Sequence, residues 1–254
     1  MNPFHLRAFR SSRAAVVFTV VFSLLISNAS AQDDPVAAIR AVIQSTQPNM
    51  IIESITPAPI EGMFQITLMN GQIINATADA RYFIPGDLFE SMPQGLVNRS
   101  EEKRNVLRAD KIAAVPESEM IIFEPENGRK ATITVFTDVD CPYCRQLHGD
   151  IERLNEFGIA VRYLGYPRTG LDTETHHKMV SAWCADNPLA MFTSANRGGE
   201  IPEVDCDNPI ARQYQLGREV GVTGTPALVL QDGTILPGYV PAETLAGYLL
   251  GSVE

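Results

Sequence analysis

Two cysteines with two residues between them, Cys141 and Cys144, are the feature of this sequence that most directly indicates chemistry. They follow a β-type run at residues 132–136 and open a segment with helical apolar spacing at residues 147–154. A CxxC pair at a strand-to-helix junction is typical of a redox dithiol. Free N–H groups and the helix dipole favour a thiolate at the first turn, so we expect Cys141 to be the nucleophile. Cys144, one turn further on, can attack a mixed disulfide on Cys141 and release it.

A zinc site is the alternative for a CxxC pair, and it needs further ligands. The sequence has no second CxxC and no HxxxH pattern. The remaining cysteines are Cys184 and Cys206, and His176 and His177 keep a mixed ligand set open as the alternative. We predict dithiol chemistry, with no metal and no cofactor.

The beginning of the sequence is typical of an export signal. Three arginines precede an apolar run at residues 14–26, and Ala29-Ser30-Ala31 matches a cleavage site of small residues. A membrane anchor is the alternative, but this run is shorter than the ~20 residues that a spanning helix needs. We therefore expect residues 1–31 to be removed and the protein to be exported. Loss of three arginines and no acids changes the formal net charge from −10 to −13, which disfavours nucleic acid as a partner.

Cys184 and Cys206 form the second pair of cysteines. They lack CxxC spacing, Trp183 beside the first is typical of a packed site, and disulfides persist in exported proteins. We predict a structural disulfide, which on the chain-entropy model stabilises the domain by about 3 kcal/mol. A labile regulatory pair, or the metal site with a histidine, is the alternative.

Residues 32–98 read as a small N-terminal domain. An amphipathic helix begins at Pro35, and Asn70-Gly71 between two β runs is a strong hairpin signal. A module of this size buries little apolar surface and leaves strand edges uncovered, so we predict that it forms a homodimer. Packing on the rest of the chain is the alternative. The predicted β runs are residues 51–55, 63–69, 72–77 and 81–84.

A charge-rich segment at residues 99–117 is predicted to be a linker helix. Ser100 is its expected N-cap, and Pro116 would end or kink it. Such a helix is usually solvated and would act as a fairly stiff spacer of about 1.5 Å per residue.

Residues 118–254 are predicted to form a second domain of the α/β class. A strand at 132–136, a helix at 141–157 and a strand at 160–164 make a β-α-β unit, which implies a parallel strand pair. A polar helical insert at about 170–207 follows. The remaining predicted elements are a helix at 210–220, strands at 227–230 and 234–236, and a helix at 241–250.

The order of strand, CPYC, helix and a later Thr225-Pro226 before a hairpin and a last helix resembles the thioredoxin fold. This resemblance implies that Pro226 follows a cis peptide bond beside the dithiol. It also implies that the backbone of Thr225 is offered to an extended substrate segment. Without the CPYC context, an ordinary loop proline would be the preferred interpretation.

Further motifs resemble the DsbC/DsbG family of periplasmic thiol:disulfide interchange proteins, and DsbC more closely. They are Phe136-Thr137-Asp138, Gly170-Leu171-Asp172, Trp183-Cys184 and residues 224–239, together with the small N-terminal module. The resemblance implies a cystatin-like α+β dimerisation module, joined by a helical linker to an α/β thioredoxin-fold domain with a helical insertion. One departure is Pro142-Tyr143 between the cysteines, where DsbC typically has Gly-Tyr and DsbG has Pro-Tyr.

The family resemblance also implies partners and a location. It implies a periplasmic homodimer whose cleft holds misfolded, disulfide-containing exported proteins, and a membrane reductant of the DsbD type. We expect Pro142 and Tyr143 to shape the substrate site, with Tyr143 as contact surface. Asp138 and Asp140 flank the nucleophile and oppose a thiolate, so we expect the helix terminus to outweigh them.

The expected activity is that of a protein disulfide isomerase or reductase. Reduced Cys141 attacks a wrong disulfide, and either a substrate thiol or Cys144 then displaces it. Three alternatives stay open: a net dithiol oxidase, a DsbG-like reductase and chaperone with weak isomerase activity, and a holdase without enzymatic activity.

Overall fold

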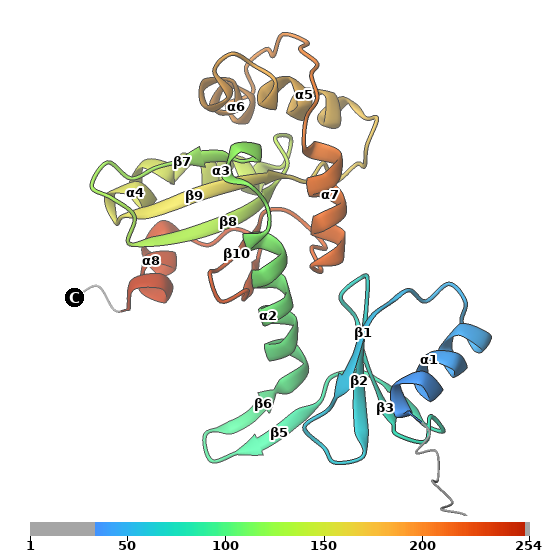
Figure 1. Cartoon of the computed structure of the whole chain (residues 1–254). Coiled ribbons are helices and arrows are strands. Elements are labelled where there is room, and N and C mark those ends of the chain that lie inside the picture. The colour runs from blue at the N-terminus through green and yellow to red at the C-terminus, as the bar shows by residue number, and fades with distance from the viewer. Residues whose placement is uncertain (1–33, 252–254) are drawn as a thin grey trace, which may run out of the picture. The chain divides into compact units, whose positions relative to one another are not determined.

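The computed structural model describes residues 34–251, which include both predicted domains (Figure 1). The predicted export signal, residues 1–31, lies outside the described residues. Within residues 34–251, no helix combines the length and apolar character that a membrane span requires.

The N-terminal module packs one helix on an antiparallel sheet (Figure 1). Helix α1 (Pro35–Thr46) buries Ile39 and Ile43 against Ile66 of the sheet. These apolar residues recur at the spacing of one helix face, which is why the segment folds as an amphipathic helix. The strands lie in the order β1-β2-β3-β4, with bounds Ile52–Pro57, Met63–Leu68, Ile73–Thr77 and Phe83–Pro85.

Strand β4 begins two residues later than the sequence predicts. The side chain of Asp79 accepts a hydrogen bond from the N–H of Arg81 at 3.1 Å, and the N–H of Thr77 donates to the carbonyl of Tyr82 at 3.1 Å. This turn occupies the first residues of the predicted strand.

Two further strands, β5 (Phe89–Met92) and β6 (Gly95–Asn98), form a separate hairpin that the sequence analysis missed. Both strands are largely exposed, so neither carries the alternation of apolar and polar residues by which a half-buried strand is recognised.

Helix α2 (Arg99–Ala113) follows the hairpin, and its N-cap is Asn98. The side chain of Asn98 accepts from the N–H of Glu101 at 2.9 Å. The prediction that Ser100 caps this helix is therefore wrong. Ser100 lies inside the first turn, fully buried, and its hydroxyl accepts from the N–H of Leu88 at 3.0 Å.

Helix α2 is also not a fully solvated spacer. Arg108 is 5% exposed; its Nε donates to the carbonyl of Val220 at 2.9 Å, and its Nη1 donates to the carbonyl of Gly233. These bonds fix the second half of α2 to the C-terminal domain. The helix ends at Ala113, and Pro116 then leads into a short 3₁₀ helix, Glu117–Glu119.

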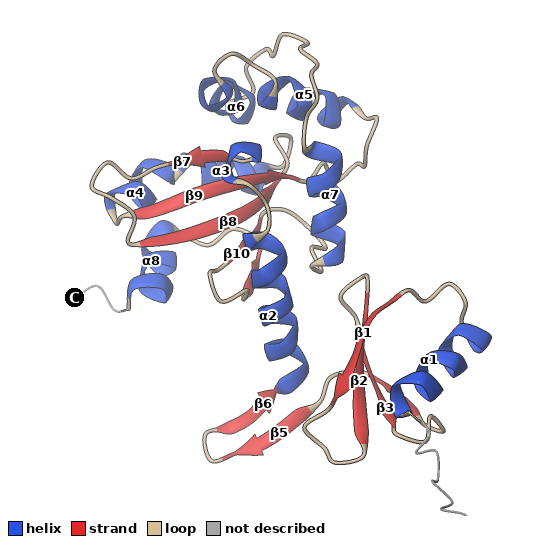
Figure 2. Cartoon of the chain, viewed as in Figure 1, coloured by secondary structure: helices blue, strands red, loops and turns tan. Residues whose placement is uncertain are grey.

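The C-terminal domain is built on a mixed sheet of order β11-β10-β8-β9-β7 (Figure 2). The predicted β-α-β unit is present, since β8 and β9 pair in parallel. Every residue of β8 is buried, as expected for a central strand covered on both faces. Strand β7, which was not predicted, pairs antiparallel to β9. The strand bounds are Ile121–Phe123 (β7), Ala131–Thr137 (β8), Ile159–Gly165 (β9), Ala227–Val229 (β10) and Ile235–Pro237 (β11).

The helix predicted at 141–157 is two helices, α3 (Pro142–Gly149) and α4 (Ile151–Glu156). Asp150 between them has φ −91° and ψ 2°, and its N–H bonds to the carbonyl of Leu147. Glycine before Asp150 weakens the helix, and the hydroxyl of Tyr239 donates to the Asp150 carboxylate at 2.7 Å. The other helices are α5 (Glu174–Trp183), α6 (Pro188–Asn196), α7 (Ile210–Glu219) and α8 (Ala242–Leu250).

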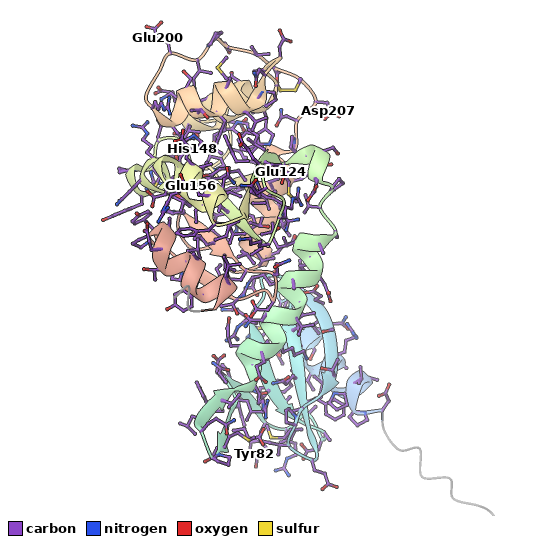
Figure 3. The ribbon with its side chains drawn as sticks, turned by 90° about the vertical axis from the view of Figure 1, so that its left-hand side faces the viewer. Tyr82, Glu124, His148, Glu156, Glu200 and Asp207 are labelled. Atoms are coloured by element: carbon purple, nitrogen blue, oxygen red, sulfur yellow. A yellow bond between two sulfur atoms is a disulfide. The ribbon has the colours of Figure 1, made fainter. Side chains whose placement is uncertain are left out.

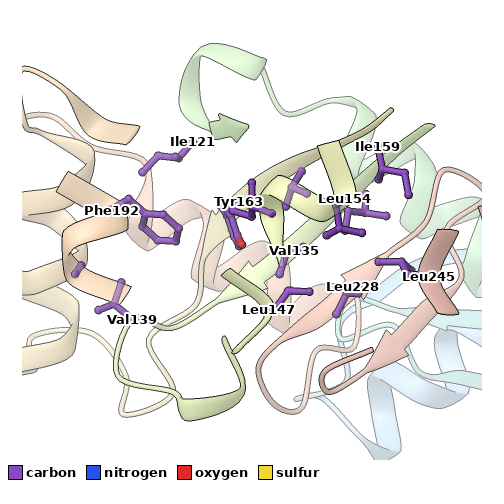
Figure 4. Close-up of a cluster of buried hydrophobic side chains, with 14 of the residues drawn as sticks. Ile121, Val135, Val139, Leu147, Leu154, Ile159, Tyr163, Phe192, Leu228 and Leu245 are labelled. Atoms are coloured by element: carbon purple, nitrogen blue, oxygen red, sulfur yellow. The ribbon is translucent and has the colours of Figure 1, made fainter. Parts of the chain in front are cut away.

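The core of this domain includes side chains from the helical insert. Phe192 of α6 is fully buried in the same cluster as Tyr163 of β9 and Leu147 of α3 (Figure 4). Met179 of α5 is also fully buried in this cluster. The insert is therefore an integral layer of the domain, because removing it would expose the face of the sheet next to the dithiol helix.

Candidate active site

The two cysteines of the CxxC motif lie where β8 ends and α3 begins. Cys141 is the N-cap of α3, with extended backbone angles, and Pro142 occupies the first helical position, where its missing N–H costs nothing. The N–H of Cys141 bonds to the carbonyl of Asp138 at 3.0 Å, which closes the turn from the strand. Both cysteines are free thiols and only 1% exposed.

Thr225 lies against Cys141 although it is far away in sequence. The Cys141 sulfur donates to the carbonyl oxygen of Thr225 at 3.2 Å. The peptide bond between Thr225 and Pro226 is cis, as the thioredoxin resemblance implies. The hydroxyl of Thr225 is buried and has no hydrogen-bond partner among the described residues while Cys141 is a thiol, so the group that it can donate to is the Cys141 thiolate.

The two thiols differ in acidity. Burial acts to raise the pKa of Cys141, but the Thr225 hydroxyl and the N–H groups of Cys144 and Tyr143 outweigh burial and hold this pKa below its ordinary value. Burial raises the pKa of Cys144 to about 12. Cys141 is therefore the thiol that ionises first, and Cys144 remains protonated at neutral pH.

Asp138, which precedes the motif, is 1% exposed and tightly bonded. One carboxylate oxygen accepts from the N–H of Asp140 at 2.8 Å. The other accepts from the N–H of Arg168 at 2.9 Å and from its guanidinium at 3.1 Å. Asp138 therefore ties the loop after β9 to the active-site turn.

Asp140 also has cationic partners, Lys178 of α5 and Arg145 of α3, at 3.2 Å and 3.1 Å. The two aspartates flank the nucleophile, where we expect them to oppose a thiolate, but each carboxylate is paired with a basic side chain that offsets its charge. Sequence reasoning missed Lys178 and Arg168, since charged residues on polar segments are indistinguishable from a solvated surface.

Tyr143, between the cysteines, is 61% exposed. Leu171 of the loop tied down by Asp138 is another exposed apolar side chain of this domain. The exposure of Tyr143 gives it the geometry of a contact surface, while Pro142 is held in the helix start.

A buried polar group that the sequence analysis also missed lies one turn beyond Cys144. His148 is 8% exposed, and Figure 3 shows it among the packed side chains of the domain. Its Nε2 is 3.1 Å from the hydroxyl of Thr193 on α6. Burial lowers the pKa of His148 to about 4, so the ring is neutral at neutral pH. It joins the dithiol helix to the insert.

Cys184 and Cys206 form the predicted disulfide, with their Cα atoms 5.7 Å apart. The bond joins the end of α5 to the segment before α7. The hydroxyl of Ser181 supports the same connection, because it accepts from the N–H of Val204 and donates to its carbonyl, at 3.1 and 3.2 Å. Within residues 34–251, no group of three or more potential ligands is arranged to hold a metal ion.

Comparisons with known proteins agree with both parts of the chain. A family model described as the disulfide bond isomerase protein N-terminal domain matches residues 29–97, and a thioredoxin-like domain matches residues 118–250. The chain is 37% identical to the thiol:disulfide interchange protein DsbC of Escherichia coli K12 over 211 residues, which cover 82% of this chain and 86% of that protein. It is 33% identical to DsbC of Haemophilus influenzae over 231 residues, covering 90% and 95%.

Among solved structures, a disulfide interchange protein from Neisseria gonorrhoeae aligns with a TM-score of 0.48 and 29% identity, covering 54% of this chain and all of that one.

Proposed function

The chain belongs to the DsbC family of thiol:disulfide interchange proteins, and from this we propose that it rearranges wrong disulfides in exported proteins. The observation that carries the proposal is the asymmetry of the dithiol. Cys141 sits at a helix start with hydrogen-bonding groups around its sulfur, whereas Cys144 is buried with a raised pKa.

The chemistry is a sequence of thiol-disulfide exchanges. The Cys141 thiolate attacks one sulfur of a substrate disulfide; a new S–S bond forms, the old one breaks, and the displaced sulfur leaves as a thiolate that takes a proton from water. In isomerisation, another substrate thiolate attacks the substrate sulfur of the mixed disulfide and returns Cys141 as a thiolate. No electrons are gained or lost in this cycle.

Reduction is the second outcome of the same intermediate. Cys144 gives up its proton and attacks the sulfur of Cys141, so the substrate leaves reduced and the enzyme holds a Cys141–Cys144 disulfide. Two electrons have then passed to the substrate, and a donor must restore the dithiol. A membrane reductant of the DsbD type fits this need in an oxidising compartment, and the export signal predicted at residues 1–31 supports a periplasmic location.

A homodimer formed by the N-terminal module is part of the proposal. Within the described residues, β4 pairs with β3 alone, so one edge of the sheet is open. Exposed apolar side chains lie on β4 and on the hairpin of β5 and β6, which follows it in the chain: Ile84 is 50%, Phe89 54% and Leu96 72% exposed. A second copy of the module would cover this edge and these side chains.

The Pro142-Tyr143 pair favours one second candidate, a DsbG-like reductase and chaperone with weak isomerase activity. Refolding of a substrate with scrambled disulfides separates the candidates. We expect the reduced protein to speed the recovery of native substrate catalytically, and a Cys141→Ala, Cys144→Ala variant to lose this effect. Equal recovery with that variant would favour a holdase. Suppression of aggregation with little isomerisation by the intact protein would favour the DsbG-like function.

A further inference from the structure

Asp140, the residue directly before Cys141, is bound by side chains of helix α5 in the insert. One carboxylate oxygen of Asp140 accepts from the hydroxyl of Thr175 at 2.8 Å and lies 3.2 Å from Lys178 Nζ. The other lies 3.1 Å from the guanidinium of Arg145 and 3.4 Å from the same Lys178 nitrogen.

Thr175 and Lys178 lie one turn apart on helix α5 and therefore face the same way. Thr175 is 7% exposed, which fixes its hydroxyl, while the side chains of Asp140 and Lys178 are about one-third exposed at 31% and 34%. Lys178 is further oriented by Glu174, one turn earlier, at 2.9 Å. The insert thus presents a preformed cation and hydroxyl to the active-site turn.

The other basic partners of Asp138 and Asp140 do not come from α5. Asp138 is balanced by Arg168, from the loop after β9, and Arg145 belongs to α3 itself, where its Nε donates to the carbonyl of Val139 at 2.8 Å. Cys144 is a neutral thiol. Lys178 is thus the basic side chain by which the insert offsets the charge of Asp140.

We propose that Lys178 is a positioning residue. By pairing with Asp140, it sets how stable the thiolate of Cys141 is relative to the thiol. The helical insert thereby tunes the redox poise of the dithiol. This inference rests on the proposed function in one respect, namely that Cys141 is the exchanging thiol.

Loss of Lys178 and loss of the Asp140 carboxylate should have opposite effects on the stability of the Cys141 thiolate. Without Lys178, the Asp140 carboxylate, one residue before Cys141, loses one of its counter-charges, so the thiolate becomes less stable. Without the carboxylate, Lys178 and Arg145 remain and the thiolate becomes more stable. Because a stabilised thiolate stabilises the reduced form, the first change makes the reduction potential more negative and the second makes it less negative.

Four variants of the mature full-length protein test this: Lys178→Met, Asp140→Asn, the double variant, and Lys178→Arg as the charge-conserving control. The thiolate fraction is followed against pH by ultraviolet absorbance, and the redox equilibrium is measured against glutathione. We expect the two single variants to change the equilibrium constant about threefold in opposite directions, as for a partly exposed ion pair. The double variant should lie between them, and Lys178→Arg should match the parent protein.

A matched control is Arg153→Met on α4, since Arg153 pairs with Glu156 and Glu243 rather than with a residue near the dithiol. It should leave both readouts unchanged. Shifts of the same sign in the two single variants, or a loss of thermal stability without any shift, would overturn the inference. Neither readout uses a protein substrate, so a failure of isomerase activity in the parent protein would be recognised separately.

Discussion

The sulfur of Cys141 donates to the carbonyl oxygen of Thr225 at 3.2 Å, across 84 residues of sequence. Ionisation of this thiol removes the proton that makes the bond, so the Thr225 carbonyl becomes available to another donor. An N–H of an extended substrate backbone is such a donor. If substrate binds to the Thr225 backbone, as the thioredoxin resemblance implies, the reactive thiolate and the free carbonyl arise together.

The roles of the two cysteines can be separated by single substitutions. Cys141→Ser should abolish both isomerase and reductase activity, because it removes the attacking sulfur. Cys144→Ser should accumulate long-lived mixed disulfides, because it removes the intramolecular escape route. Non-reducing gels after acid quenching measure the trapped species. Equal trapping by the two variants would reverse the assigned roles.

The buried His148 predicts a loss of stability in acid. Its pKa falls from an ordinary 6.5 to about 4 on folding, so the unfolded chain binds the proton more tightly than the folded one. His148 therefore leaves the free energy of unfolding unaffected above about pH 6.5. As the pH falls from there towards 4, protonation of His148 in the unfolded chain lowers the free energy of unfolding by about 3 kcal/mol. In denaturant titrations across this range, His148→Gln should show a shallower pH dependence. An unchanged slope would contradict the prediction.

Arg108 predicts that the linker helix contributes to the stability of the C-terminal domain. Arg108→Met keeps much of the apolar stem but leaves the carbonyls of Val220 and Gly233 without their donor. We expect a loss of about 2–3 kcal/mol in the free energy of unfolding. Arg212→Met is the control, because Arg212 is 62% exposed and should cost less than about 1 kcal/mol. Equal effects of the two changes would show that α2 is not anchored through Arg108.

Removal of the Cys184–Cys206 disulfide should lower stability without much effect on thiol-disulfide exchange at Cys141. Cys184→Ala with Cys206→Ala opens a loop of 22 residues and should lower the free energy of unfolding by about 3 kcal/mol. Reductase activity at low temperature should remain within about twofold, since neither cysteine belongs to the exchanging pair. Loss of activity in a variant that is still folded by circular dichroism would assign this bond a catalytic role.

The open edge of β4 predicts that the homodimer can be dissociated by one charge. Ile84→Glu, at a side chain that is 50% exposed, should give a monomer that still reduces small disulfides and isomerises protein substrates poorly. Light scattering at micromolar concentration measures the state. Tyr248→Glu on α8, also exposed, is the matched control and should remain dimeric. A monomeric parent protein would remove this part of the proposal.

Contiguous motifs made much of this site predictable. The CPYC segment and Thr225-Pro226 each carry their signal within a few residues, and the strand-to-helix junction follows from local periodicity. The cationic partners did not carry such a signal, because Lys178 meets Asp140 across 38 residues and Arg168 meets Asp138 across 30. Pairings of this kind depend on how α5 and the loop before it fold back on the sheet.

Errors in the predicted elements have local causes. Serine favours N-cap positions, but here the side chain of Asn98 accepts the hydrogen bond from the first turn, at the N–H of Glu101. The hydroxyl of Ser100 instead accepts from the N–H of Leu88. The hairpin of β5 and β6 is exposed on both faces and so lacks a pattern. The break between α3 and α4 at Asp150 was not predicted, because the apolar spacing continues across this short interruption. Leu147, Ile151 and Leu154 all reach the core.

One domain of this protein holds sulfur in two states, a closed bond between Cys184 and Cys206 and free thiols at Cys141 and Cys144. A protein that opens disulfides must spare its own. If a thiol opens the bond at the end of α5, the hydrogen bonds between Ser181 and Val204 still hold the two segments together, so the released cysteine stays close and displaces the attacker. We therefore expect this arrangement to favour reclosure of the Cys184–Cys206 bond over its lasting loss to an attacking thiol.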